Sequence, residues 1–226
     1  GPGIVRINAD MMVDPGATLT IGPGVIVEIA NGVDLTVDGT LRINGEENNP
    51  AVITAAPGSI WGGVFVNGEV HARFLFTTRG GEDSNWFSDS GFSAHRKEQA
   101  TFLFNSGSLG SFEDCYWIEN PGQALHVKDA TLSLDRCLVQ RSPTTGQFNG
   151  GTVTLRDCHL VEFPIDFPEF ADDDNDAIYF TTGDHEPIDS VIRWAKGDGV
   201  DAGSGSTGTV LVDGCWFETC FPETMA

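Results

Sequence analysis

The sequence predicts an all-β chain wound into a right-handed parallel β-helix, a three-sided solenoid with about 22 residues per coil. Three observations predict this fold. Short segments in which apolar and polar residues alternate recur along the chain, bounded by Gly, Pro and Asp. No stretch keeps apolar residues at helical spacing past two turns. A cysteine-centred strand motif also repeats at nearly constant spacing.

The repeat is clearest where short strands align on their central cysteine. Cys115, Cys137 and Cys158 follow one another at steps of 22 and 21 residues, and Cys215 closes the series. We expect Val191 to hold the same position in the coil between Cys158 and Cys215. A period near 22 suits one coil of three short strands joined by turns. The motif therefore predicts a row of small apolar side chains inside the solenoid.

The cysteines need neither a disulfide nor a metal to explain them. Free cysteine behaves as a small hydrophobic residue in a core. The chain has no CxxC spacing, which argues against a zinc site. Cys220 lies outside the row, and we expect it in a turn.

The N-terminal third repeats less regularly but with the same pattern. Leu, Val and Ile alternate with Thr and charged residues, so each strand has one buried face. Pro-Gly and Asp-Gly fall where turns are needed. The segments concerned are residues 16–27, 35–43, 50–54 and 61–66.

A family resemblance rests on these segments. GATLTIGPGVIVEI, LTVDGTLRINGEENNPAVIT and WGGVFV resemble the opening coils of secreted bacterial β-helix proteins of the pectate-lyase-like superfamily. DNDAIYF and HEPIDSVIRWAKGDGVDAGSG resemble Asp-rich coils of large extracellular proteins of that superfamily. The resemblance runs from about Val13 to the end and implies an extracellular or cell-surface protein. It leaves the activity open, because the superfamily includes lyases, hydrolases, esterases, adhesins and scaffolds.

We expect a single β-helix domain over residues 1–226, with two interruptions. A polar loop is expected at residues 79–99 and an acidic loop insertion at residues 164–176. Gly1-Pro2 resembles the scar of a tag-removing protease, so the sequence by itself leaves open whether the natural protein carries a leader. The last residues read as a strand with no polar cap, so we expect truncation there or cover by another chain or domain. The sequence leaves the oligomeric state open.

Charge restricts the partners. The chain has 12 basic and 33 acidic residues, a formal net charge of −21. Such a surface repels the phosphate backbone, so we expect no nucleic-acid partner. No run of 18 apolar residues exists, so no membrane span is expected. The family resemblance implies a polysaccharide as a possible partner.

The acids concentrate between Asp166 and Asp201, where eleven acids accompany two bases. Asp176 and Asp198 are 22 residues apart, and Glu223 follows 25 residues later. Carboxylates on neighbouring coils would stack at about 4.8 Å. They repel at that distance unless a cation, a base or a proton compensates.

This acidic run predicts a Ca²⁺ site, because hard cations prefer oxygen ligands. Asp172, Asp174 and Asp176 alternate as at the start of an EF-hand loop, but Ala177 and Gly183 break that motif. The ligands expected are Asp172, Asp174, Asp176, Asp198 and Asp201. A solvated acidic loop of turn-forming Asp residues is the alternative.

Three catalytic hypotheses follow from the same region. A glycoside hydrolase would take its two carboxyl groups from Asp176, Asp198, Asp201 and Glu223. A calcium-dependent polysaccharide lyase would use Arg193 or Lys196 as its base. His185, between Asp184 and Glu186, is either an acid–base group or a turn residue. Motifs of nucleophilic hydrolases, phosphate loops and dinucleotide sites are missing.

The position after each cysteine carries a large side chain. The residues are Tyr116, Leu138, His159, Ile192 and Trp216. An outward-facing stripe of this kind would stack on sugar rings, and flanking loops that bury it are the alternative. We expect Tyr116, Trp216, Arg193 and Lys196 to bind substrate.

Together these features predict an extracellular carbohydrate-binding or carbohydrate-processing β-helix with a calcium-supported acidic site. One alternative is a non-catalytic structural or adhesive module of a larger surface protein. The other is a polysaccharide lyase or glycoside hydrolase that lacks part of its domain.

Overall fold

The computed structural model describes residues 3–81, 99–163, 176–202 and 207–220. The regular secondary structure of these residues consists of β-strands, and the strands pair in parallel, as the sequence predicts. No helix in the described ranges is long and apolar enough to cross a membrane. Residues 82–98 and 164–175, most of the two predicted loops, lie outside the described residues.

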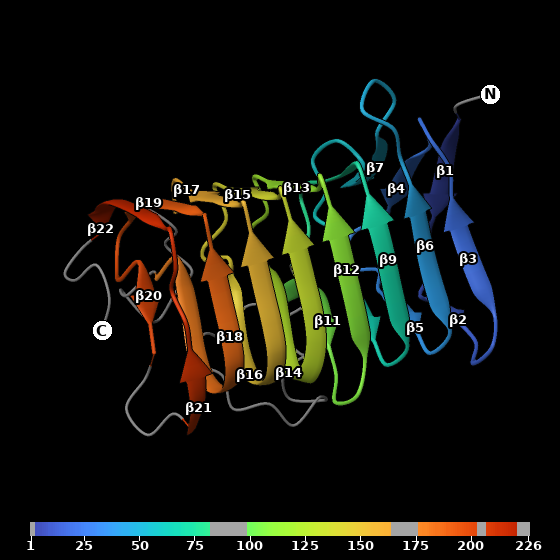
Figure 1. Ribbon diagram of the computed structural model, residues 1–226. Helices are drawn as coiled ribbons and strands as arrows, with labels where there is room; N and C mark the ends of the chain where they lie inside the picture. Colours follow the sequence, from blue (N-terminus) through green and yellow to red (C-terminus); the bar gives the residue numbers. More distant parts are fainter. Residues whose placement is uncertain (1–2, 82–98, 164–175, 203–206, 221–226) are drawn as a thin grey trace.

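The described strands form two sheets (Figure 1). The nine-stranded sheet contains, in spatial order, β1 (Ile4–Ile7), β4 (Ile26–Ile29), β7 (Ala51–Ala55), β10 (Leu75–Thr77), β13 (Tyr116–Ile118), β15 (Leu138–Gln140), β17 (His159–Val161), β19 (Val191–Ala195) and β22 (Trp216–Cys220). The second sheet contains β2 (Met11–Val13), β5 (Leu35–Val37), β8 (Val64–Val66), β11 (Ala100–Phe104), β14 (Gln123–Asp135), β12 (Leu109–Glu113), β9 (Glu69–Arg73), β6 (Thr40–Asn44) and β3 (Thr18–Ile21), joined by β16 (Gly146–Arg156), β18 (Ile178–Ile188), β20 (Val200–Asp201) and β21 (Thr207–Val210).

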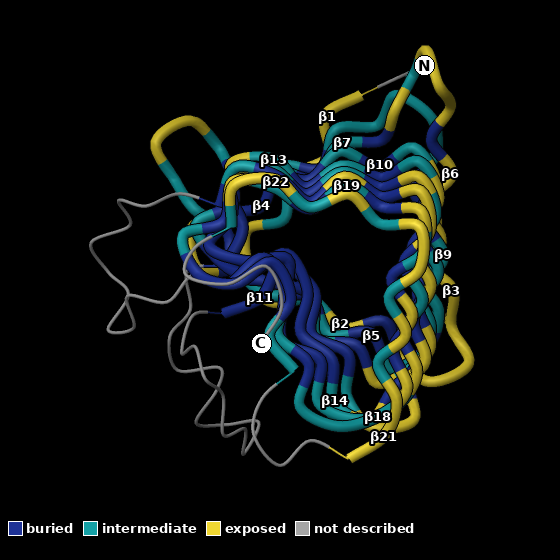
Figure 2. The backbone as a smooth tube through the Cα atoms, turned by 60° about the vertical axis from the view of Figure 1, so that its left-hand side comes forward, coloured by how far each residue is buried: buried dark blue, intermediate teal, exposed yellow. Residues whose placement is uncertain are grey.

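The second sheet has two arms, which the long strands β14, β16 and β18 hold together. The first arm contains β2, β5, β8 and β11, and the second arm contains β3, β6, β9 and β12. β14 pairs with β11 through its first half and with β12 through its second half. Each turn of the chain therefore visits the nine-stranded sheet once and each arm once. Successive turns overlay one another around a common interior (Figure 2), with the buried residues lining that interior. A side chain thus has its register partners on the preceding and following turns.

The corner between the second arm and the nine-stranded sheet repeats one backbone conformation. Its residues have positive φ values near +50°, which side chains other than glycine rarely adopt. These residues are Phe74, Asp114, Arg136, Asp157 and Asp189. Each amide donates to a carbonyl of the next turn, as Asp114 N does to Asp135 O at 3.0 Å. The corner is therefore stabilised by bonds between turns rather than within one turn.

Charged side chains at this corner also bridge turns. Arg136 donates to Asp114 and Asp135 and, at 2.6 Å, to Oε1 of Glu113. Hydrogen bonds to Asp114 and Glu113 raise the pKa of Arg136 above its usual value. All four side chains reach solvent, so the network contributes little stability and mainly orders the surface.

The core consists of the inward-facing side chains of both sheets. One part of it is an aromatic cluster that lies between the first arm, the second arm and the nine-stranded sheet. Phe112 contacts Trp117, Phe102 and Phe104 with ring centroids 4.9, 5.3 and 6.0 Å apart, all edge-on. All four rings are essentially inaccessible to solvent. Edge-to-face packing of this kind adds stability beyond the area buried.

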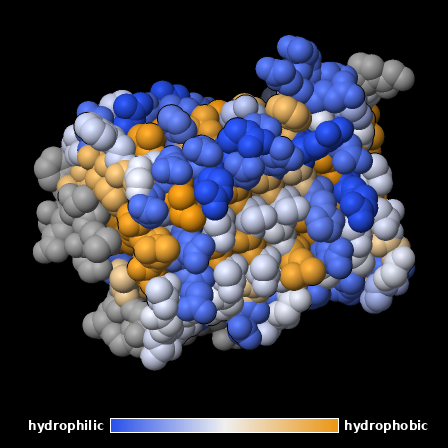
Figure 3. Space-filling view, in the orientation of Figure 1, coloured by the Kyte–Doolittle hydropathy of each residue, from blue (hydrophilic) through white to orange (hydrophobic). Residues whose placement is uncertain are grey.

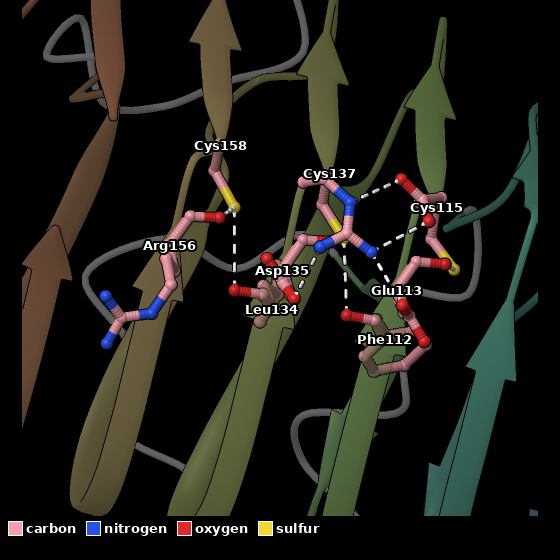
Figure 4. Close-up of polar contacts among 10 residues, drawn as sticks. Phe112, Glu113, Cys115, Leu134, Asp135, Cys137, Arg156 and Cys158 are labelled. Carbon is pink, nitrogen blue, oxygen red and sulfur yellow. Dashed lines mark hydrogen bonds and ion pairs between the residues drawn. The ribbon is translucent and has the colours of Figure 1, made fainter. Parts of the chain in front are cut away.

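The structure contains the predicted row of cysteines, but its fourth member is one residue earlier in the sequence than predicted. Cys115, Cys137 and Cys158 lie buried on consecutive turns, with the thiols of Cys137 and Cys158 directed at carbonyls of the preceding turn (Figure 4). The next member is Ser190, because His159 pairs with Val191. The prediction that Val191 holds this position was therefore wrong. Ser190 fits because its hydroxyl accepts from Cys158 N and donates to Ile188 O.

The cysteines form no disulfide. Burial and the thiol of Cys115 raise the pKa of Cys137, and the thiol of Cys137 together with burial raises the pKa of Cys158, so these thiols stay protonated. Cys220 ends β22, paired with Ala195, rather than lying in a turn as predicted. The cysteines of this row thus fill the core as small buried side chains, as the sequence predicts.

Candidate functional site

Asp176 and Asp198 lie on neighbouring turns at the start of β18 and just before β20. The amide of Asp198 donates to Oδ1 of Asp176 at 2.8 Å, and the amide of Ala177 donates to the carbonyl of Asp198 at 2.8 Å. The two residues are only 2% and 7% exposed. Asp176 is therefore compensated in part by a backbone dipole, a way of accommodating a buried carboxylate that the sequence analysis did not consider.

Asp201 is in the same region. It pairs with Tyr179, and Val200 pairs with Ile178, which is the register that the 22-residue spacing predicts. Burial raises the pKa of Tyr179, and the charges of Asp201 and Asp176 raise it further. The tyrosine hydroxyl thus stays a hydrogen-bond donor next to two of the candidate carboxylates.

A row of polar residues continues from Asp201 across the first arm. Gln147 pairs with Tyr179, and His126 pairs with Gln147. These side chains face away from the core, because side chains alternate along a strand and the neighbours of each belong to the core cluster. His126 is fully buried, and desolvation lowers its pKa to about 3, so its imidazole is neutral. The row runs from buried His126 to half-exposed Asp201.

Sequence reasoning missed His126 and Gln147. One signal was present, an apolar–polar–apolar triplet at the start of successive turns. It reads Leu125-His126-Val127, Gly146-Gln147-Phe148 and Ile178-Tyr179-Phe180. The signal is weak because the polar residue changes type in each turn and the spacing lengthens from 21 to 32 residues. We define the candidate acidic site as Asp176, Tyr179, Asp198 and Asp201, and the polar row as its extension.

The acidic site includes three of the five predicted calcium ligands, Asp176, Asp198 and Asp201. Within the described ranges, no three His, Cys, Asp or Glu side chains are grouped so that they hold a metal ion. Asp172 and Asp174, the other two predicted ligands, and Glu223, the fourth catalytic candidate, lie outside the described residues. The structure brings Asp176, Asp198 and Asp201 into one region, and three carboxylates with a hydroxyl are ligand chemistry that suits a hard cation.

A second candidate surface is the outer face of the nine-stranded sheet. One outward position recurs on every strand and pairs with the same position on the next strand. We call this row the outer stripe. Its members are Ile4, Ile26, Val52, Phe76, Tyr116, Leu138, His159, Val191 and Trp216.

Four of the five residues predicted to face outward after the cysteine position belong to the outer stripe, and one prediction was wrong. Val191 takes the place that the sequence analysis gave to Ile192, which points inward and is buried. The cause is the same one-residue shift that puts Ser190 in the cysteine row. The stripe is at least partly accessible along its whole length, and Trp216 is 65% exposed. Phe76 and Tyr116 stack with ring centroids 6.5 Å apart.

Arg193 and Lys196 lie near the last turn. Arg193 is on the outer face beside the stripe, with its guanidinium 4.0 Å above the ring of Trp194 and 3.8 Å from Glu218. Lys196 is half-exposed and follows β19. Arg193 thus lies beside Trp194 and Glu218.

His185 does not lie in a turn. It is part of β18 and faces the core, where its ring stacks on Phe180 at 4.6 Å between centroids. Its Nε2 contacts the carbonyl of Thr182 at 2.6 Å, and burial lowers its pKa. Asp184 and Glu186 point outward, away from it. The acid–base role and the turn position were therefore both wrong, because a strand places His185 and its acidic neighbours on opposite faces.

Comparisons with models of protein families, with curated proteins and with solved structures find no match to this chain. The features of the described residues that bear on function are the two candidate surfaces, the acidic site and the outer stripe.

Proposed function

We propose that this chain is a carbohydrate-binding, right-handed, three-sided parallel β-helix of the pectate-lyase-like superfamily, acting outside the cell or at its surface. The observation that carries the proposal is the outer stripe. It offers a continuous row of apolar and aromatic side chains at the spacing of parallel strands, about 4.8 Å. A linear glycan fits such a row because the apolar faces of successive sugar rings pack on it while their hydroxyls stay in water.

The charge of the chain favours a neutral glycan. At −21, the protein repels polyanions such as uronate polymers over the range of the screened field. Arg6 and Arg193, next to the stripe at its two ends, are each accompanied by a glutamate, Glu28 and Glu218. A uronate would therefore meet carboxylates beside these arginines, whereas a neutral sugar would meet only hydrogen-bonding groups.

The test removes the stripe's aromatic side chains. Trp216→Ala and Tyr116→Ala are each expected to raise the Kd for a neutral oligosaccharide by about tenfold, since losing one such contact costs about 1.4 kcal/mol. Titration calorimetry against a panel of neutral and acidic glycans measures this. Leu109→Ala is the matched control, because Leu109 is 42% exposed on the other sheet. Equal weakening by all three variants, or binding of no glycan, would refute the proposal.

We further propose that the acidic site binds Ca²⁺ and stabilises the last turns. Asp198→Ala is then expected to weaken calcium binding and to lower the unfolding temperature in calcium but not in chelator, because bound ligand stabilises only the folded state. Thermal unfolding with calcium and with chelator measures this. Asp213→Ala, which changes an exposed aspartate of the same part of the chain, is the control. The same loss in both conditions would leave Asp198 a packing role only.

A structural or adhesive module of a larger surface protein is the second candidate. It is favoured by the last described turn, where Phe217 and Cys220 pack against the core yet stay partly exposed. Such a turn would suit contact with another domain. A lyase or hydrolase that lacks part of its domain is less supported, because the carboxylate of Asp176 already accepts the amide of Asp198.

A further inference from the structure

A third group of side chains lies on the outer face of the second arm, away from both proposed binding surfaces. His71 on β9 contacts two groups at once. Its Nδ1 is 2.9 Å from Oγ of Ser111 on β12, and its Nε2 is 3.2 Å from Oε2 of Glu69. A hydroxyl, an imidazole and a carboxylate thus form one hydrogen-bonded chain, the arrangement that activates a serine nucleophile.

The sheet fixes this arrangement. Glu69 and His71 are two residues apart on β9 and therefore face the same side, and Ser111 pairs with His71 in register. The required tautomer follows from the contacts, because Nε2–H donates to the carboxylate and leaves Nδ1 to accept from the hydroxyl. All three side chains are partly accessible, so a substrate reaches the hydroxyl.

The group borders a depression of about 370 Å³. His71, Ser111, Arg73 and Ser133 are among its lining residues. Figure 3 looks onto this face, where hydrophilic side chains alternate with apolar patches. The volume suits a small ligand. Backbone amides of the paired strands are used in the sheet, so a developing oxyanion would need a side-chain donor. Arg73, two residues from His71 on β9 and among the lining residues, is the cation that could supply it.

We propose that Ser111, His71 and Glu69 hydrolyse small acyl esters. Oγ of Ser111 attacks the acyl carbon while its proton passes to Nδ1 of His71. The ester C–O bond then breaks, and the leaving alkoxide takes that proton. Water attacks the acyl-serine, gives its proton to His71, and releases the acid as Ser111 recovers the proton. Glu69 is a positioning residue that holds the imidazole and stabilises its charged form.

The test uses the full chain with p-nitrophenyl acetate and a fluorophosphonate probe. We expect slow turnover and labelling of Ser111, located by peptide mass spectrometry. Ser111→Ala and His71→Gln are each expected to lower kcat/KM by about 100-fold. Glu69→Gln is expected to lower kcat with little change in KM. These residues lie on the surface of a sheet, so the variants are expected to fold.

A matched control separates the site from background chemistry. Ser106→Ala removes an exposed serine that lies outside the depression, in the turn before β12, where its hydroxyl donates to Asp129. This variant is expected to keep the parent rate and the Ser111 label. Equal rates in all variants, or a label elsewhere, would overturn the proposal. The assay does not involve the outer stripe, so its failure would leave the glycan proposal standing.

Discussion

Phe112→Ala is expected to lower the free energy of unfolding by about 3–5 kcal/mol, the range for deleting a fully buried phenylalanine ring. Phe112 is 1% exposed and contacts Trp117, Phe102 and Phe104. Its removal leaves a cavity between two rings of β11, Phe102 and Phe104, and the ring of Trp117 on β13. Strands paired with both neighbouring turns resist collapse into that space. Denaturant unfolding monitored by circular dichroism measures the loss.

Phe76→Ala is the matched control. Phe76 is also a strand phenylalanine, but it points outward in the outer stripe and is partly exposed. Its removal is expected to cost less, because part of its side chain already contacts water. Equal losses of stability from both variants would mean that Phe112 does not point into the core and Phe76 does not point outward.

The slope of the denaturant dependence gives separate information. In stacked turns each turn contacts mainly its neighbours, so a change in this slope would indicate that the Phe112 turn unfolds separately.

The parallel strand pairing illustrates what the sequence could predict. Turns repeat the same apolar alternation, so the parallel pairing, the cysteine row and the register of Asp176 with Asp198 followed from spacing alone. The error at Val191 has a physical cause. Alignment by apolar character favours valine over serine, but a buried hydroxyl is acceptable where two hydrogen bonds satisfy it, as at Ser190.

The candidate sites were harder to predict because they depend on groups brought together from different turns. His71 and Ser111 are 40 residues apart, and the intervening interruption hides their register. His126 and Gln147 share a row only because their strands pair, since nothing in their residue types repeats. For His185 the sequence predicted a functional or turn position that the structure does not show. Asp-His-Glu resembles a polar turn, but in the strand the histidine side chain points inward and stacks on Phe180.

Acidification is expected to destabilise the fold through His126. Its imidazole is fully buried, and desolvation lowers its pKa from 6.5 to about 3. Below pH 6.5 the unfolded chain takes up a proton that the folded chain refuses until about pH 3. The stability is therefore complete above pH 6.5 and declines as the pH falls toward 3. The loss due to His126 is about 2 kcal/mol at pH 5. His185, whose pKa burial also lowers, acts in the same direction.

His126→Gln separates this effect from the titration of the many carboxylates. Protonation of carboxylates relieves repulsion in a chain of net charge −21, so the pH profile of the parent alone is a sum of opposing effects. The difference in stability between parent and His126→Gln cancels the shared carboxylate contribution. The free energy of unfolding of the parent minus that of His126→Gln is expected to decrease as the pH falls from 7 to 5. Urea unfolding at several pH values measures it, with His159→Gln, an exposed histidine, as control. A difference that stays constant over this range would mean that His126 binds its proton equally in the folded and unfolded chain, and the burial argument would fail.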